Sequence, residues 1–481
     1  MSFVDIRFLF FFPLVVILHF LLPERFRWMW LLGASYIFYM AWRPEYALLL
    51  ATITVIDFTA GIVMSRSSDT RVRKAALVTS LVANLGILFF FKYFNFFFAS
   101  IGAGLAAIGT TAHLPVLDII LPIGISFHIF QSVSYTIDVY KRTAQPVTHL
   151  GKFALYVSFF PQLVAGPIER PNGLLVQFFE KRRFDALRAH MGVLLMLLGY
   201  FKKLVIADNL APLVNTVYSS PENFTGPSLM IATVLFAFQI YCDFSGYTDI
   251  ARGTAKILGY DLAVNFDRPY LSKSITEFWR RWHISLSSWL RDYLYISLGG
   301  NRKGSFRTYL NLLTVFILCG LWHGANVTYV VWGLWQGVFL IIERLGMKEW
   351  LEKNMPYIQQ PIMFVIISIG WVFFRSNSLG EARYILNHFF VGIPEFISKL
   401  STAQGIAEVI FMNMPWYGAC IGVLGVGVLI YSEYITATVP SKISLLDGGR
   451  LFRSTFYGAC VILIMLLGTF VHSGQFIYFQ F

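Results

Sequence analysis

The chain has 481 residues, of which 57% are hydrophobic and only 13% are charged. A soluble domain has roughly 25% charged and about 45–50% apolar residues, so this chain has too few polar side chains to cover a water-soluble globule. The composition predicts a multi-pass membrane protein. The net charge is +12, and the basic residues lie in short loops between apolar runs. This placement indicates a role in membrane topology and argues against a nucleic-acid partner.

Apolar runs of transmembrane length recur along the chain, and a helical span needs about 20 mostly apolar residues. We expect about 11 to 13 spans, all helical, because lipid offers no partners for unpaired backbone groups. The predicted spans are residues 6–22, 28–43, 45–64, 76–98, 117–139, 190–214, 228–252, 308–321, 326–343, 361–375, 414–432 and 455–472. They predict an all-α transmembrane bundle that forms one membrane-embedded domain over residues 1–481.

The loops set the predicted orientation, because cytoplasmic loops carry an excess of Lys and Arg. The basic loop 65–75 is expected inside, and residues 99–116, which contain no Lys, Arg, Asp or Glu, are expected outside. Continued along the chain, this alternation puts both termini outside. It also puts residues 376–412 outside, where we expect short surface helices.

Two apolar segments do not fit an alternation of full spans. The basic loops on both sides of residues 152–169 are expected inside, so this segment is predicted to be re-entrant or interfacial. In residues 274–290, Ser274 and Glu277 form a capping box, and apolar side chains then recur at helical spacing. We expect one amphipathic helix lying flat at the cytoplasmic surface, with His283 at the border of its apolar face.

Ionisable side chains within apolar runs are candidates for function, because they are costly to bury in lipid. His323 lies between two apolar stretches and precedes Gly324, so we expect it at a helix break that faces a cavity. There an imidazole can accept a proton from a hydroxyl group; a structural histidine is the alternative. His283 is the second candidate, and Asp57 is expected to pair within the bundle.

A dense polar cluster lies near the inner end of one predicted span and contains Asp243, Ser245, Tyr247 and Asp249. Buried carboxylates and hydroxyls need partners, so these residues could line a tunnel or orient a catalytic group.

Basic residues beside His283 could hold a phosphorylated donor such as coenzyme A: Arg280, Arg281 and Arg291. Attraction to anionic lipid head groups is the alternative. The sequence contains no metal-ligating pair, P-loop or dinucleotide fingerprint, so we expect no bound metal or cofactor.

The motifs together resemble the membrane-bound O-acyltransferase family, and most closely its bacterial alginate O-acetyltransferase branch. The similarity runs through most of the chain and is densest in a core at 117–345. The residues that carry it are 121–127, 165–167, 243–249, 274–300 and 320–326.

This resemblance implies acyl transfer across a bacterial inner membrane. His323 matches the family's essential histidine, and His283 matches a second, upstream polar position. Trp322 and Asn326 are our further candidates for support of the site. A developing oxyanion needs hydrogen-bond donors, which the sequence does not name, and Asn326 is our candidate for one. The resemblance also implies acetyl-CoA as the cytoplasmic donor, an exopolysaccharide acceptor outside, and a periplasmic SGNH-type partner.

The outer tail, residues 473–481, resembles the F-x-Y-x-x-F ending of related acyl-transfer systems, in which the tyrosine is proposed as an acyl carrier. The hypothesis is that Tyr478 receives acetyl with His323 as base, because a phenol with a pKa near 10 needs base assistance. An aromatic belt at the outer interface is the alternative.

Other functions remain open. They are D-alanyl transfer to teichoic acid, O-acetylation of peptidoglycan, and non-enzymatic transport of a polysaccharide or lipid. Broken helices and midplane polar groups also occur in transporters, but the inverted repeats typical of that class are not visible in the sequence.

Overall fold

The structure, a computed structural model, describes residues 1–110, 114–438, 450–470 and 476–477. Within these ranges every regular element is a helix and no β-strand occurs, which confirms the all-α prediction. Seven of the described helices are long and apolar enough to cross a membrane, and three shorter apolar helices accompany them. The higher count of about 11 to 13 spans stays a prediction.

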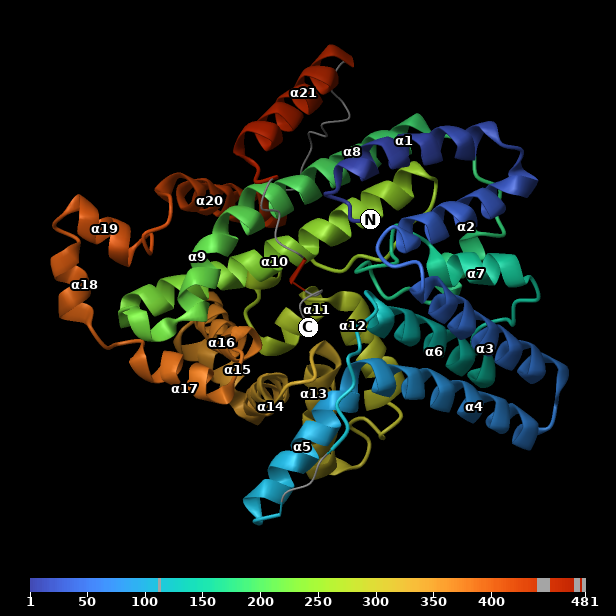
Figure 1. Cartoon of the computed structure of the whole chain (residues 1–481), viewed down its shortest axis with the longest axis horizontal. Coiled ribbons are helices and arrows are strands. Elements are labelled where there is room, and N and C mark those ends of the chain that lie inside the picture. The colour runs from blue at the N-terminus through green and yellow to red at the C-terminus, as the bar shows by residue number, and fades with distance from the viewer. Residues whose placement is uncertain (111–113, 439–449, 471–475, 478–481) are drawn as a thin grey trace. The chain divides into compact units, whose positions relative to one another are not determined.

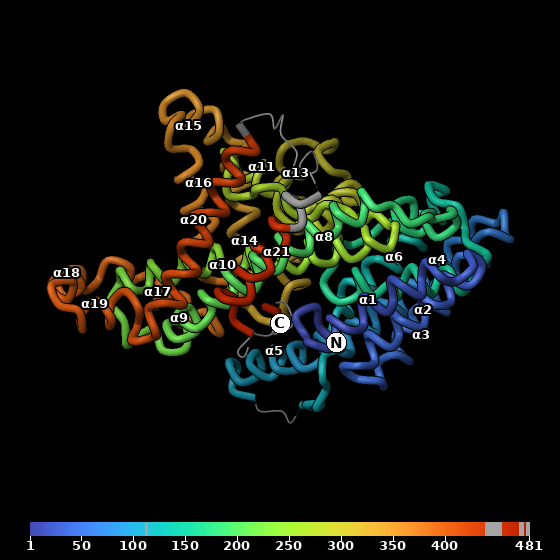
Figure 2. The backbone as a smooth tube through the Cα atoms, turned by 90° about the horizontal axis from the view of Figure 1, so that it is seen from above, coloured from blue at the N-terminus to red at the C-terminus, as the bar shows by residue number. Residues whose placement is uncertain are grey.

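The chain divides into two compact units, whose residues can be followed by colour in Figures 1 and 2. Unit 1 is Met1–Met196 with Ala251–Val264, and unit 2 is Leu197–Ile250 with Asn265–Phe481. One membrane-embedded domain over the whole chain stays a prediction.

Unit 1 contains a short buried helix, α7, at the segment predicted to be re-entrant or interfacial. α7 (Leu150–Ser158) ends before Pro161, and the irregular backbone that follows is buried as far as Glu169. The other helices of unit 1 are α1 (Ile6–Leu21), α2 (Glu24–Met40), α3 (Tyr46–Arg66), α4 (Thr70–Leu88), η1 (Phe89–Tyr93), α5 (Phe94–Ala107), α6 (Ile125–Lys141), η2 (Pro171–Leu175), most of α8 (Ala186–Tyr200) and the end of α10 (Gly226–Ile257).

A buried carboxylate joins helices of unit 1. Asp57 on α3 accepts hydrogen bonds from the Ser80 hydroxyl at 2.6 Å and the Asn84 amide at 2.9 Å, both on α4. The Ser80 hydroxyl also lies 3.2 Å from the hydroxyl of Thr136 on α6. Asp57 therefore pairs within the bundle, as predicted.

Unit 2 contains the closely packed pair α13 (Gly304–His323) and α14 (Val327–Ile342) (Figure 1). A Cβ atom added at Gly320 would lie 2.1 Å from the Tyr329 carbonyl oxygen, and one at Gly333 would lie 2.1 Å from the Phe316 oxygen. Small residues therefore allow the two backbones to approach, as is typical of membrane helices.

The remaining elements of unit 2 include the three short helices α17, α18 and α19, which confirm the short helices predicted for residues 376–412. In Figures 1 and 2, α18 and α19 lie at the edge of the unit. These elements are η3 (Phe201–Ala207), α9 (Asp208–Ser219), η4 (Pro221–Asn223), most of α10, η5 (Pro269–Leu271), α11 (Ile275–Arg281), α12 (Ile284–Trp289), η6 (Leu290–Tyr295), η7 (Glu343–Met347), α15 (Lys348–Asn354), α16 (Gln359–Arg375), α17 (Leu379–His388), α18 (Ile393–Lys399), α19 (Ala403–Val409), α20 (Trp416–Thr438) and α21 (Arg450–Leu467).

Candidate active site

His323 is the last residue of α13, at a break between two helices. Gly324 continues in an extended conformation and Asn326 caps the start of α14, so the predicted helix break is confirmed. The imidazole is buried, with 3% of the residue exposed. Three aromatic ring centroids lie 5.0–5.3 Å from that of His323: Trp322, Trp332 and Phe374.

His283 is buried in unit 2 and lies between two short helices, α11 and α12. Its backbone is in the left-handed region, with φ 44° and ψ 53°. The prediction of one continuous helix over residues 274–290 is therefore wrong. The reason is Asn265, whose backbone oxygen accepts from the Ile284 N–H at 2.9 Å and whose side-chain oxygen accepts from the Ser285 N–H at 3.2 Å.

The start of α11 matches the predicted cap in one of its two halves. The Ser274 hydroxyl accepts from the Glu277 N–H at 3.1 Å, as a capping box requires. The Glu277 carboxylate instead accepts from the Lys273 N–H at 2.8 Å. The N–H of Thr276, in the first turn of α11, donates at 3.1 Å to the carboxylate of Glu343 on η7.

The two histidine rings face the same aromatic cluster, with centroids 6.4 Å apart. His283 is fully buried, and it also contacts Phe244 at 4.7 Å and Trp322 at 5.9 Å. Burial lowers the pKa of His283 to about 3, because the charged imidazolium would lose its hydration. His283 is therefore neutral at cellular pH and can act as a hydrogen-bonding group.

The polar cluster at 243–249 is buried within α10, and its two carboxylates are paired with lysines. The ammonium of Lys203 lies 2.6 Å from an oxygen of Asp243 and 2.8 Å from an oxygen of Asp208. The ammonium of Lys202 lies 2.8 Å from Asp249. These pairs provide the partners that the buried carboxylates need.

Lys202, Lys203 and Asp208 were not singled out in the sequence, although two lysines inside an apolar run are a signal of function. The backbone explains the pairing of Lys203 with Asp208. Both lie at or next to η3, a π-helix, and a π-helical turn aligns residues five apart.

The described end of the chain is held on this same cluster. The Ile477 N–H donates to the second oxygen of Asp243 at 2.8 Å, and this contact is buried. The Phe476 ring lies 4.9 Å from the Tyr247 ring and 5.6 Å from the Phe244 ring. Tyr478, the candidate acyl carrier, lies outside the described residues.

The other predicted support residues are all buried or engaged in local structure. Ser245 and Tyr247 are 1% and 5% exposed, and Trp322 is 4% exposed. The Asn326 side chain accepts from the Thr328 N–H at 3.1 Å and donates to the Asn377 carbonyl at 3.0 Å. Its amide group is thus committed to capping α14 and to a neighbouring loop.

Two of the three candidate donor-binding arginines form ion pairs with neighbouring carboxylates. Arg281 pairs with Glu277 at 2.8 Å, and Arg291 pairs with Asp292 at 2.6 Å. Arg280 is exposed and forms no ion pair in the described part of the chain. Among the described residues there is also no group of three His, Cys, Asp or Glu that could hold a metal ion.

Comparison with known proteins finds relatives that are named as acyl-transfer enzymes. A "probable alginate O-acetylase AlgI" from Azotobacter vinelandii is 41% identical over 82% of this chain and 79% of its own length. A peptidoglycan O-acetyltransferase from Helicobacter pylori is 32% identical over 82% of this chain and 81% of its own length. A teichoic acid D-alanyltransferase from Streptococcus thermophilus is 28% identical over 48% of this chain and 58% of its own length.

The family model of the membrane-bound O-acyltransferases matches residues 139–381, which include His283 and His323. Together with the extended similarity to the acetylases and the apolar helices, this match identifies the chain. It belongs to the membrane-bound O-acyltransferase family and is a multi-pass membrane O-acyltransferase.

Proposed function

We propose that this protein transfers an acetyl group from cytoplasmic acetyl-CoA, across a bacterial inner membrane, for O-acetylation of an alginate-type exopolysaccharide. The observation that carries the proposal is the buried pair His283 and His323, with rings 6.4 Å apart within an aromatic cluster. The 41% identity with a probable alginate O-acetylase favours this acceptor over peptidoglycan and teichoic acid.

In the proposed mechanism, His323 takes the proton of the acceptor hydroxyl as its oxygen attacks the thioester carbonyl. The C–S bond then breaks, the thiolate leaves, and the imidazolium returns the proton to form free coenzyme A. The aromatic rings around His323 exclude water, which protects the thioester from hydrolysis and strengthens electrostatic interactions in the site. The neutral His283 serves as a hydrogen-bonding partner in the same aromatic cluster.

The tail hypothesis gains support from the residues before Tyr478. Phe476 and Ile477 are buried against Tyr247 and Asp243. Phe476 also contacts Phe244, whose ring lies 4.7 Å from that of His283, so the described segment before Tyr478 reaches the surroundings of the histidines. The phenol oxygen of Tyr478 would attack the thioester to form acetyl-tyrosine, and a hydroxyl of an SGNH-type partner would then take the acetyl group and restore the phenol.

We propose the orientation derived from the loops, with both termini outside. Exposed Arg280 then lies on the cytoplasmic side and is the arginine most available to the donor's phosphates. Arg281 and Arg291 would have to leave their carboxylates to contribute.

The test compares base-labile acetate in the exopolysaccharide and wall fractions of cells that carry wild type or His323→Ala, at matched protein levels in the membrane. We expect a loss of at least about 100-fold in one fraction, since general bases contribute roughly 10²–10⁴-fold. That fraction identifies the acceptor polymer. His388→Ala, a histidine on α17, is the matched control and should leave acetate unchanged. Unchanged acetate in His323→Ala would reject acyl transfer through this residue.

The carrier step needs its own test. Tyr478→Phe removes the nucleophilic oxygen but keeps the ring, and we expect it to abolish polysaccharide acetylation. When the wild-type protein is isolated from cells without the SGNH-type partner, mass spectrometry should find an acetyl group on Tyr478. Full acetylation in Tyr478→Phe would eliminate the carrier and leave the aromatic-belt explanation.

A further inference from the structure

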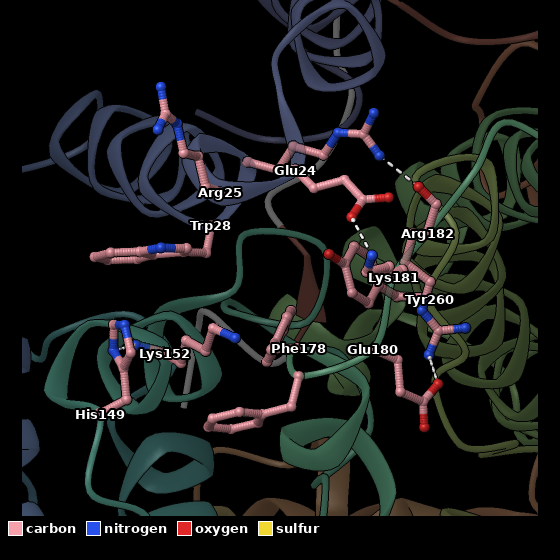
Figure 3. A pocket seen from close by; sticks show the side chains of 12 residues that line it. Glu24, Arg25, Trp28, His149, Lys152, Phe178, Glu180, Lys181, Arg182 and Tyr260 are labelled. Carbon is pink, nitrogen blue, oxygen red and sulfur yellow. Dashed lines mark hydrogen bonds and ion pairs between the residues drawn. The ribbon is translucent and has the colours of Figure 1, made fainter.

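A polar pocket of about 370 Å³ lies within unit 1 (Figure 3), near the lower end of the roughly 300–1000 Å³ range of ligand pockets. Five Lys or Arg residues and only two Glu residues line it, together with aromatic rings. A pocket with this excess of positive charge favours an anionic ligand. The lining residues are Glu24, Arg25, Arg27, Trp28, His149, Lys152, Phe178, Phe179, Glu180, Lys181, Arg182 and Tyr260.

One side of the pocket is built by Arg27, which is fixed by backbone carbonyls. Its guanidinium donates to the oxygens of Leu22 at 3.0 Å and Phe20 at 3.3 Å, and also to the oxygen of Arg182. Carbonyl groups orient this cation without neutralising it. Arg27 therefore contributes a full positive charge to the wall.

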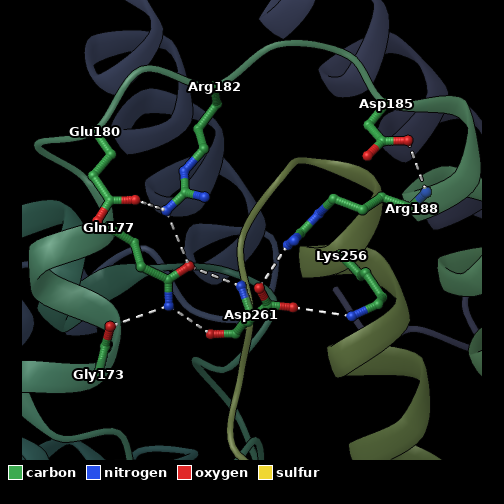
Figure 4. A network of polar contacts seen from close by, with 8 residues as sticks. All are labelled: Gly173, Gln177, Glu180, Arg182, Asp185, Arg188, Lys256 and Asp261. Carbon is green, nitrogen blue, oxygen red and sulfur yellow. Dashed lines mark hydrogen bonds and ion pairs between the residues drawn. The ribbon is translucent and has the colours of Figure 1, made fainter.

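A polar network holds the adjoining wall, which includes Arg182 (Figure 4). Gln177 donates to the Asp261 carbonyl and accepts from the Asp261 N–H, both at 2.9 Å. The Arg182 guanidinium donates to Glu180 at 2.6 Å and lies over the Tyr260 ring at 5.6 Å. The wall is thus built before any ligand arrives.

Two lysines remain available to a ligand. Lys152 forms no ion pair in the described part of the chain, and its ammonium lies 4.2 Å from the centroid of the Phe179 ring and is directed into the pocket in Figure 3. Lys181 is 3.7 Å from Glu24, and its side chain is 85% exposed, so this pair contributes little stability. Partial burial lowers the pKa of Lys152, because the ammonium loses hydration there.

Exposed apolar side chains lie on the pocket lining or close to it along the chain. Phe179, a lining residue, is 50% exposed. Leu150, next to His149, and Val176, two positions before Phe178, are each 45% exposed. A soluble phosphate has no use for such surface, whereas the acyl chains of a lipid would cover it. We propose that this pocket binds the phosphate group of an anionic membrane phospholipid, with Lys152 and Lys181 as its ligands and the acyl chains along Leu150, Val176 and Phe179.

The test uses the purified full-length protein in detergent, with lipid binding measured by native mass spectrometry. Phosphatidylglycerol is the anionic probe and phosphatidylcholine is the zwitterionic one. We expect tighter binding of phosphatidylglycerol by wild type. Lys152→Gln should weaken this binding about fivefold, because a basic residue near an anionic surface contributes about that factor. The double variant Lys152→Gln with Lys181→Gln should weaken it by about the same factor again. Lys152→Arg should retain binding.

Lys74→Gln is the matched control, because Lys74 is exposed on α4 and forms no ion pair among the described residues. An equal loss in Lys74→Gln would show general surface attraction and overturn the proposal. Equal binding of the two lipids by wild type would also overturn it. A further arm adds inorganic phosphate or ADP, and displacement of phosphatidylglycerol by either at a comparable concentration would assign the pocket to a soluble phosphate. Because no arm measures acetylation, a failed acetyltransferase test leaves this result unaffected.

Discussion

Units 1 and 2 bury their carboxylates in different ways. In unit 1, Asp57 accepts hydrogen bonds from the neutral side chains of Ser80 and Asn84. In unit 2, Asp243 is paired with the ammonium of Lys203 and also accepts the N–H of Ile477 from the described end of the chain.

The difference teaches what each carboxylate can do. The donors to Asp57 both lie on α4, so the interaction fixes α3 against α4. In unit 2 a single ammonium, that of Lys203, serves both Asp208 and Asp243. One ammonium cannot neutralise two carboxylates, and a further N–H donor can stabilise the negative charge that remains. Asp243 is therefore suited to hold a segment that arrives from elsewhere in the chain.

Lys203→Met should have the largest effect on stability. It leaves the carboxylates of Asp208 and Asp243 buried without their counter-charge, and breaking a buried pair in this way costs about 3–5 kcal/mol. We expect a matching fall in the free energy of unfolding, measured by denaturant titration of the detergent-solubilised protein. Low levels in the membrane should accompany it.

Asp57→Asn is the contrasting change in unit 1. The amide oxygen can still accept from Ser80 and Asn84, so we expect a cost of about 1 kcal/mol. Equal costs for Lys203→Met and Asp57→Asn would remove the distinction between the two units.

The sequence predicted those features that depend on neighbours along the chain. The all-α fold, the helix break after His323 and the Ser274 cap follow from apolar periodicity, Gly324 and a local hydroxyl. The turn at His283 does not, because the apolar repeat continues across it. The turn depends on Asn265, which lies 20 positions from Ser285 along the chain, and such a tertiary contact has no local signal.

The lysines of the site illustrate a different limit. Lys202 and Lys203 stand within a predicted span, where their cost in lipid is a signal that the sequence analysis missed. Even with that signal, their partners could not have been assigned. Asp208 matches Lys203 only at the five-residue spacing of a π-helix, whereas an α-helix aligns residues three or four apart. Asp243 and Asp249 are on another helix altogether, and only the fold brings them to the lysines.

Glu169 provides a pH-dependent test of burial in unit 1. It is 3% exposed, and one oxygen accepts from the Ala263 N–H at 2.7 Å. Burial raises its pKa from 4.5 to about 7, against the opposing effects of Ala263 and the charge of Arg252. The neutral form is thus preferred in the folded state. This contribution to stability is fully present below pH 4.5 and is lost as the pH rises through about 7.

Glu169→Gln should remove this pH dependence, which amounts to roughly 3 kcal/mol between the two limits. The measurement is the unfolding midpoint of both proteins across pH 4.5 to 8.5, a range set by the pKa of Glu169. Glu45→Gln, at an exposed site in unit 1, is the matched control and should follow wild type. A Glu169→Gln profile parallel to wild type would mean that Glu169 is not the group that titrates.

Asn326→Ala should lower stability by about 1 kcal/mol, as little as Asp57→Asn, because loss of an N-cap costs about that much. Asn326→Asp separates the cap from a direct role in catalysis, since a carboxylate caps a helix as well as an amide but cannot donate a hydrogen bond. A lost oxyanion donor lowers kcat by roughly 10²–10³-fold, so acetylation by Asn326→Asp would collapse if the amide acted on the reacting carbonyl. We expect acetylation by Asn326→Asp to stay within a few-fold of wild type, because the amide already donates to the Asn377 carbonyl at 3.0 Å. Asn326 would then serve the site in unit 2 by capping α14 just after the helix break at His323, which is a task that Asp can perform.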